Sequence, residues 1–107
     1  PYKRNVRLAE QLKILLSDYF IKKSIYIDKK KPIIITITKV DLSDDIRYAS
    51  VYLTSIDSYK NKDRIISFLN NNSKSYKYII GKKIRTKNIP NIRFIYDDIF
   101  QDNFNIN

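Results

Sequence analysis

Two runs of β-forming residues, 33–40 and 47–54, dominate the hydrophobic pattern of this chain. In the second run Ala49, Val51 and Leu53 alternate with hydroxyl-bearing residues. A period of two gives a strand one apolar face and one polar face. The first run begins with consecutive isoleucines, which indicates either a β-bulge or a strand covered on both faces. Both runs are therefore predicted to be strands.

Residues 41–45 separate these runs and are rich in the Asp and Ser that favour turns. The two strands are thus expected to form an antiparallel hairpin. A third strand is predicted at 92–97, where Ile92, Phe94 and Tyr96 alternate with other residues.

Helical periodicity appears before the hairpin, over residues 6–23. Apolar side chains recur there at spacings of three and four, at Val6, Ala9, Leu12, Leu16, Tyr19 and Phe20. Asn5 is expected to cap this helix, after a basic lead-in. The charged segment 28–32 is read as a linker that ends at Pro32.

A second apolar stripe follows the hairpin and is interrupted once. After polar turn residues 57–61, it runs over 62–69, meets three asparagines and a serine at 70–73, and resumes at 76–84. Asparagine tolerates backbone conformations that end helices. We therefore predict two short helices joined by a kink.

The predicted element order is α-β-β-α-kink-α-β, an α+β fold with a three-stranded sheet and the helices packed on one face. The expected core contains Leu12, Leu16, Val51, Leu53, Ile65, Leu69, Ile80 and Phe94. One domain of 1–107 is predicted, ordered over about 5–98 with a polar tail at 101–107. This order is that of the type II KH fold, which binds nucleic acids. The chain has a single glycine, Gly81, so the GXXG loop of ordinary KH domains is excluded.

Charge and missing residue types narrow the function classes. The chain of 107 residues carries 21 basic and 11 acidic side chains, a net charge of +10, which favours a polyanionic partner. Cys, His and Trp are absent, which excludes disulfides and thiolate chemistry. No apolar run reaches the roughly 20 residues that a membrane-spanning helix needs.

Four segments, in order along the chain, resemble the ribosome-binding factor A family. They are VRLAEQL at 6–12, VDLSDDI at 40–46, ASVY at 49–52 and IPNIRFIYD at 89–97. The resemblance implies a type II KH-like fold in which a helix kink of Ala-x-Gly type replaces GXXG. It also implies binding to immature small-subunit ribosomal RNA and a role in its processing and in subunit maturation.

The kink is where this chain departs from the family pattern. Counting back from Gly81, which matches the glycine after the family's kink, places the motif on Asn72, Ser73 and Lys74. The family's glycine is therefore absent, and Lys74 adds a positive charge at this point.

Six basic residues that begin at the kink are the main RNA-binding candidates. This basic strip comprises Lys74, Lys77, Lys82, Lys83, Arg85 and Lys87. No acidic residue lies between Lys74 and Asn91, so a phosphate-binding surface is favoured over an ordinary solvated helix face. Lys3, Arg4 and Arg7 form a second basic group, either an RNA-binding arm or a solvated one.

Four tyrosines are candidates for stacking on bases. Tyr76 lies on the apolar stripe, which favours a place in the core, whereas Tyr78 lies off it. Tyr48 and Tyr52 occupy the polar face of the second strand. They form either a stacking platform or cross-strand packing, and packing is favoured.

Two acidic pairs, Asp44-Asp45 and Asp97-Asp98, are interpreted as turn and strand-end residues. Adjacent strand residues point to opposite faces, which argues against a metal site or an acid–base pair. Ser43 has no histidine to activate it. We therefore expect no enzyme activity, no metal and no cofactor.

The leading hypothesis is a monomeric, non-catalytic assembly factor that binds small-subunit ribosomal RNA and the immature small subunit. The alternative is a basic module for acidic membranes or proteins; a membrane partner is disfavoured because the apolar stripe of the first helix is needed to cover the sheet. The start at Pro1 and the Lys-, Asn- and Ile-rich usage predict a protein imported into a plastid-like organelle, with the bacterial cytoplasm as the alternative.

Overall fold

The computed structural model describes residues 2–27, 31–55 and 61–99, with side chains from Arg4 onward. Its elements follow the predicted order: α1 (Tyr2–Lys22), β1 (Ile35–Leu42), β2 (Tyr48–Ser55), α2 (Lys62–Asn71), α3 (Ser73–Gly81) and β3 (Asn91–Tyr96). The predicted tail 101–107, most of the turn at 57–61 and residues 28–30 of the predicted linker lie outside the described residues.

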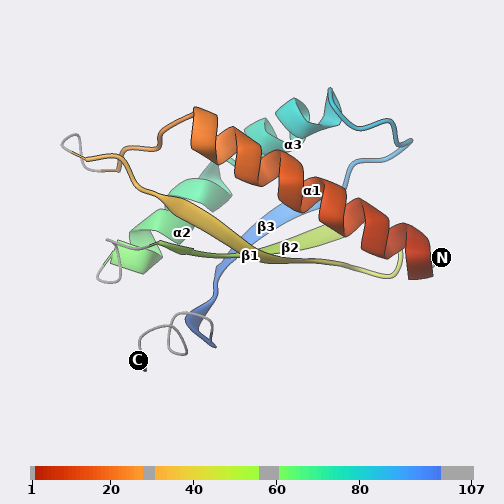
Figure 1. Cartoon of the computed structure of the whole chain (residues 1–107), viewed down its shortest axis with the longest axis horizontal. Helices are drawn as coiled ribbons and strands as arrows, with labels where there is room; N and C mark the ends of the chain where they lie inside the picture. Colours follow the sequence, from red (N-terminus) through yellow and green to blue (C-terminus); the bar gives the residue numbers. More distant parts are fainter. Residues whose placement is uncertain (1, 28–30, 56–60, 100–107) are drawn as a thin grey trace.

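The three strands form one sheet in the order β1-β2-β3. β1 and β2 are the antiparallel hairpin, in which Val40 pairs with Val51. β3 runs parallel to β2, and this direction requires the crossover through α2 and α3. α1 and α3 lie on the same side of the sheet (Figure 1). The structure is thus the predicted α+β fold.

A β-bulge in β1 explains its mixed hydrophobic pattern. Ile37 pairs with Leu53, and Lys39 pairs with the next residue of β2, Tyr52, so Thr38 is the extra residue. The bulge reverses the parity of the strand, and both Ile37 and Val40 therefore point into the core. The Thr38 hydroxyl donates a 2.6 Å hydrogen bond to Asp97 Oδ2 at the end of β3.

The core lies between the sheet and the helices. All eight residues predicted for it are at most 2% exposed. Tyr76 is also buried, as its position on the stripe indicated. Its ring packs edge-on against Tyr19, Phe20 and Phe94, with centroid distances of 5.4 to 5.7 Å. This aromatic cluster joins α1 and α3 to β3.

Several predicted boundaries differ from those of the structure, and the starts of α1 and β1 have a clear physical cause. α1 begins at Tyr2, so Asn5 is a helical residue and not a cap, and no separate lead-in precedes the helix. No glycine or proline between Tyr2 and Asn5 stops the helix from extending. β1 begins at Ile35 because Ile33 pairs elsewhere: its N–H donates to the carbonyl of Ile25, 2.8 Å away, beyond the end of α1.

The break between α2 and α3 falls at Asn72, inside the asparagine run. Asn72 has φ −106° and ψ 11°, outside helical geometry, and closes one helix while opening the next. Its side-chain amide donates to the Phe68 carbonyl at 2.8 Å. Side-chain bonds of this kind compete with the helical ladder.

The Asn70 side chain, unlike that of Asn72, binds the outer edge of β3. Asn70 Nδ2 donates to the Phe94 carbonyl at 3.1 Å, and the Phe94 N–H donates to Asn70 Oδ1 at 2.8 Å. The amide thus takes the place that a further strand would occupy. The polar run both breaks the helix and attaches it to the sheet.

Candidate nucleic-acid interface

The basic strip lies on the surface of α3 and the loop that follows it. Lys74, Lys82, Lys83, Arg85 and Lys87 are exposed, and Lys77 is half-buried. No acidic residue occurs anywhere between Asp63 and Asp97. The cations of this segment therefore produce a positive field that no acidic residue of the same segment reduces.

Four residues of α3 line a shallow hollow of about 330 Å³, namely Lys74, Lys77, Tyr78 and Gly81. Tyr78 is 66% exposed, and Lys82 Nζ lies 4.5 Å from its ring centroid. Lys77 Nζ donates to Asn91 Oδ1 at 2.9 Å, which fixes this side chain across the start of β3. The hollow therefore offers an aromatic ring surrounded by cations, a combination typical of single-strand RNA binders.

Lys74 is the kink residue that reaches this hollow. Ser73 and Lys74 are the first two residues of α3, directly after Asn72. The lysine that stands in the family's kink motif is exposed on the same surface as the rest of the basic strip.

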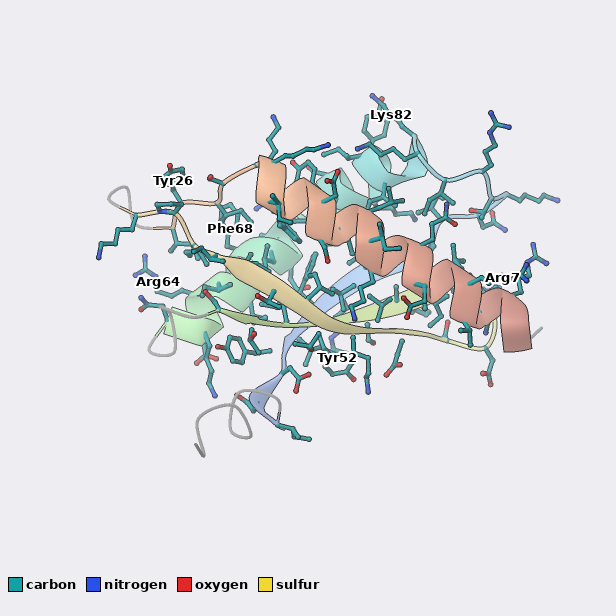
Figure 2. The ribbon with its side chains drawn as sticks, in the orientation of Figure 1. Arg7, Tyr26, Tyr52, Arg64, Phe68 and Lys82 are labelled. Atoms are coloured by element: carbon teal, nitrogen blue, oxygen red, sulfur yellow. The ribbon has the colours of Figure 1, made fainter. Side chains whose placement is uncertain are left out.

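The second basic group does not form an arm. Lys3, Arg4 and Arg7 all belong to the first turns of α1. Arg7 is exposed at the end of the molecule shown at the right of Figure 2, well apart from Lys82. The side chain of Lys3 lies outside the described residues. Arg4 contributes to a separate groove described below.

A larger groove, of about 840 Å³, lies beyond the loop after α3. It joins three segments that are distant in sequence: the first turns of α1, the β1–β2 turn and the α3–β3 loop. These segments lie at the same end of the molecule in Figure 1. Arg4, Arg47 and Lys87 line this groove, and Ile89 lines both it and the α3 hollow. The two cavities are therefore neighbours.

Arg47 was missed by the sequence reasoning. No local signal marks it, because it follows the polar turn as a single cation between Ile46 and Tyr48. Its place in the groove comes from the parallel pairing of β2 and β3, which sets the Arg47 carbonyl 2.8 Å from the N–H of Asn91.

The tyrosines of β2 have different environments. Tyr52 projects on the side of the sheet away from α1 (Figure 2), and Lys39 Nζ lies 4.8 Å from its ring centroid. This contact is the cross-strand packing that the sequence favoured. Tyr48 is 60% exposed and lines the large groove.

Both acidic pairs contain an aspartate that makes structural contacts, Asp45 in the β1–β2 turn and Asp98 after β3. Asp45 accepts hydrogen bonds from the Ser43 hydroxyl at 2.8 Å and the Arg47 N–H at 3.2 Å, and these bonds lower the pKa of its carboxyl group. Asp98 pairs with Lys62 at 3.0 Å. Within the described ranges, no three acidic residues gather where they could hold a metal ion.

Comparison with known proteins identifies the relatives of this chain. The family model for ribosome-binding factor A matches residues 4–107. The chain belongs to the ribosome-binding factor A family. A ribosome-binding factor A from Thermodesulfovibrio yellowstonii is 33% identical over 109 residues, covering 99% of this chain and 86% of the relative.

Solved structures of the ribosome-binding factor A family share the fold. The crystal structure of the Thermus thermophilus protein superposes with a TM-score of 0.71 at 18% identity, over 86% of this chain and 93% of that one. A homology model of the Thermus thermophilus factor, fitted into a cryo-EM map of a 30S complex, also matches, with a TM-score of 0.58 at 16% identity. It covers 79% of this chain and 90% of that one.

Proposed function

We propose that this protein binds small-subunit ribosomal RNA through the basic strip and assists RNA processing and maturation of a bacterial-type small subunit. It acts as a monomer and without catalysing a reaction. The observation that carries the proposal is the acid-free region between Asp63 and Asp97, whose cations surround the hollow on α3. Family membership and the related factor in a 30S complex support it.

The strip would bind phosphates and would not read bases. Lysine presents a compact point charge that suits phosphate oxygens and is poor at planar recognition of base edges. The chain lacks the GXXG loop that clamps nucleotides in ordinary KH domains. RNA position would therefore depend on the shape and charge of α3 and its loop.

The membrane alternative is disfavoured by the outer face of α1. Val6, Ile14 and Ile21 are exposed there, but Glu10 is exposed among them. A helix that lies on an anionic membrane has a basic face, and acids on it are repelled. No helix in the described part of the chain has the length and apolarity to cross a membrane. The predicted compartment, a plastid-like organelle or the bacterial cytoplasm, remains a prediction.

The test is the salt dependence of RNA binding in two variants of equal charge. One replaces Lys82, Lys83 and Arg85 with Gln, and the control replaces the lysines at 29–31, a run outside the strip. Removing three phosphate contacts should lower the slope of log K against log salt by roughly 2 to 3. The loss should be similar for unrelated RNAs, and circular dichroism should show an intact fold.

The control variant should keep most of the slope, because its lysines are not part of the strip. Equal weakening in both variants would mean that net charge, and no localised surface, drives binding. Co-sedimentation with free small subunits, and not with assembled ribosomes, tests the partner separately. A parallel pull-down with anionic vesicles tests the membrane alternative.

A further inference from the structure

The hollow on α3, which belongs to the basic strip, lies on one particular side of the Tyr78 ring. The four helical residues that line it are spaced three and four apart, so they share one face of α3: Lys74, Lys77, Tyr78 and Gly81. At about 3.6 residues per turn, the other three lie roughly 40° to 100° from Tyr78 around the helix axis, all in the same direction. The hollow is therefore beside the ring, on a single flank of it.

Lys82 occupies the opposite flank of the ring. It lies about 40° from Tyr78 in the other direction around the helix, and it does not line the hollow. Its Nζ is 4.5 Å from the ring centroid, a cation–π contact that holds the ring from that side. Tyr76 and Ile80 are buried on the far side of α3, so the Tyr78 side chain points away from the core. The ring thus has a cation on one flank and the open hollow on the other.

Gly81, the single glycine of the chain, leaves space in this hollow. Its φ is not positive, so the backbone conformation does not require a glycine there, and an alanine would favour the helix. A Cβ at this position would lie 3.4 Å from Ile89 Cγ1, an ordinary van der Waals distance, so packing does not exclude a side chain either. A longer side chain would extend over Ile89, which also lines the hollow. The glycine therefore provides open space beside the Tyr78 ring.

The two lysines of the hollow have hydrogen-bond donors to offer. Lys77 Nζ donates one bond, to Asn91 Oδ1, and an ammonium group has further donors. Lys74 is exposed, and within the described residues it forms no ion pair. A volume of about 330 Å³ is at the lower end of the roughly 300 to 1,000 Å³ that small-molecule sites occupy. The hollow therefore suits one planar group with an adjacent anion, and not a longer ligand.

We propose that this hollow binds one unpaired nucleotide of the RNA, with its base stacked on the Tyr78 ring and over Ile89 and its phosphate on Lys74 and Lys77. The inference rests on the proposed function and deepens it: the strip supplies charge, and the ring adds a preference for unpaired RNA. Stacking is possible with every base, so it needs no recognition of base edges. A base inside a duplex is covered on both faces by its neighbours and does not reach the ring. A free phosphate would leave the ring and Ile89 unused.

The experiment compares the binding of two RNA probes by fluorescence anisotropy at one salt concentration. One is a single strand of mixed sequence, roughly 12 nucleotides long, within the span that single-strand binders cover. The other is the same strand annealed to its complement. The quantity compared is the ratio of single-strand affinity to duplex affinity, because a loss of charge alone weakens the binding of both probes.

Three variants change the hollow and two are controls. Tyr78→Leu keeps apolar bulk without a ring, Tyr78→Phe keeps the ring, and Gly81→Leu fills the space beside it. Tyr26→Leu is the control for loss of a tyrosine, because Tyr26 is 53% exposed at the end of the molecule away from Arg7 (Figure 2). Ser75→Leu is the control for an added leucine, because Ser75 is exposed in α3 and does not line the hollow.

Tyr78→Leu should lower the affinity ratio by roughly 5- to 150-fold, the factor that one aromatic–base stack contributes. Gly81→Leu should lower it as well, although the ring is still present, because the leucine side chain takes the place of the base. Tyr78→Phe should recover the ratio that Tyr78→Leu loses. Tyr26→Leu and Ser75→Leu should keep the wild-type ratio, and circular dichroism should show an intact fold in all five variants.

Three results would overturn the inference. The first is a wild-type affinity ratio in Tyr78→Leu. The second is an equal loss on both probes, which would show a general effect on the surface. The third is a ratio that falls in Tyr78→Leu but not in Gly81→Leu, which would place the base outside the hollow. If the variant of Lys82, Lys83 and Arg85 loses binding to both probes while Tyr78→Leu keeps the wild-type ratio, the proposed function stands and only the nucleotide site fails. A wild-type protein that binds neither probe at low salt would refute both.

Discussion

Replacing Asn70 with Ala should destabilise the protein far more than replacing its neighbour Asn71. The Asn70 amide makes two hydrogen bonds to the backbone of Phe94, of 2.8 and 3.1 Å. Phe94 is 1% exposed and lies on β3, one of the two edge strands of the sheet. Without the amide, the N–H and C=O of Phe94 lose these partners in a partly buried place.

The magnitude follows from those two bonds. A buried polar group left without its partner costs about 1–3 kcal/mol, so two such groups would cost about 2–6 kcal/mol. Asn70 itself is half-buried, and water that enters the site would recover part of this. Alanine also favours the helix by up to about 0.7 kcal/mol relative to asparagine. We expect a net loss of about 2–3 kcal/mol in the free energy of unfolding.

The assay is urea denaturation followed by far-ultraviolet circular dichroism. Asn71→Ala is the matched control, because Asn71 is exposed in the same helix and makes no side-chain hydrogen bond within the described residues. It should change the free energy of unfolding by less than about 0.5 kcal/mol. If the two variants unfold at the same urea concentration with the same m-value, the Asn70 amide does not hold α2 to β3.

Two further changes test the core. Leu53→Ala, at a residue with 0% exposure, should cost about 2–5 kcal/mol in the same assay, and a loss below about 1 kcal/mol would mean that β2 faces the other way. Burial raises the pKa of the Tyr76 hydroxyl to about 12, so between pH 10 and 12 the unfolded chain loses this proton and the folded chain keeps it. The resulting stability is complete below pH 10 and falls by about 2–3 kcal/mol as the pH rises to 12. Tyr76→Phe should remove that part of the pH dependence, and an unchanged slope would show that this hydroxyl is solvated.

The hydrophobic pattern determined the order of the elements and most of the core. Alternation at 49–53 and spacings of three and four at 12–20 report which side of each element is covered, whatever covers it. The predicted core residues are therefore buried. The run of asparagines likewise predicted the helix break, because these side chains compete with helical hydrogen bonds. Local signals of this kind need no knowledge of the rest of the chain.

The tertiary structure decided what depends on contacts between distant segments. The start of β1 was placed two residues early because the pairing of Ile33 with Ile25 leaves no mark in either segment. The bulge at Thr38 and the bond from Asn70 to β3 depend on the register of the sheet. The groove is the clearest case. Its cations come from positions 4, 47 and 87, which meet because the crossover sets β3 parallel to β2, whereas periodicity describes one element at a time.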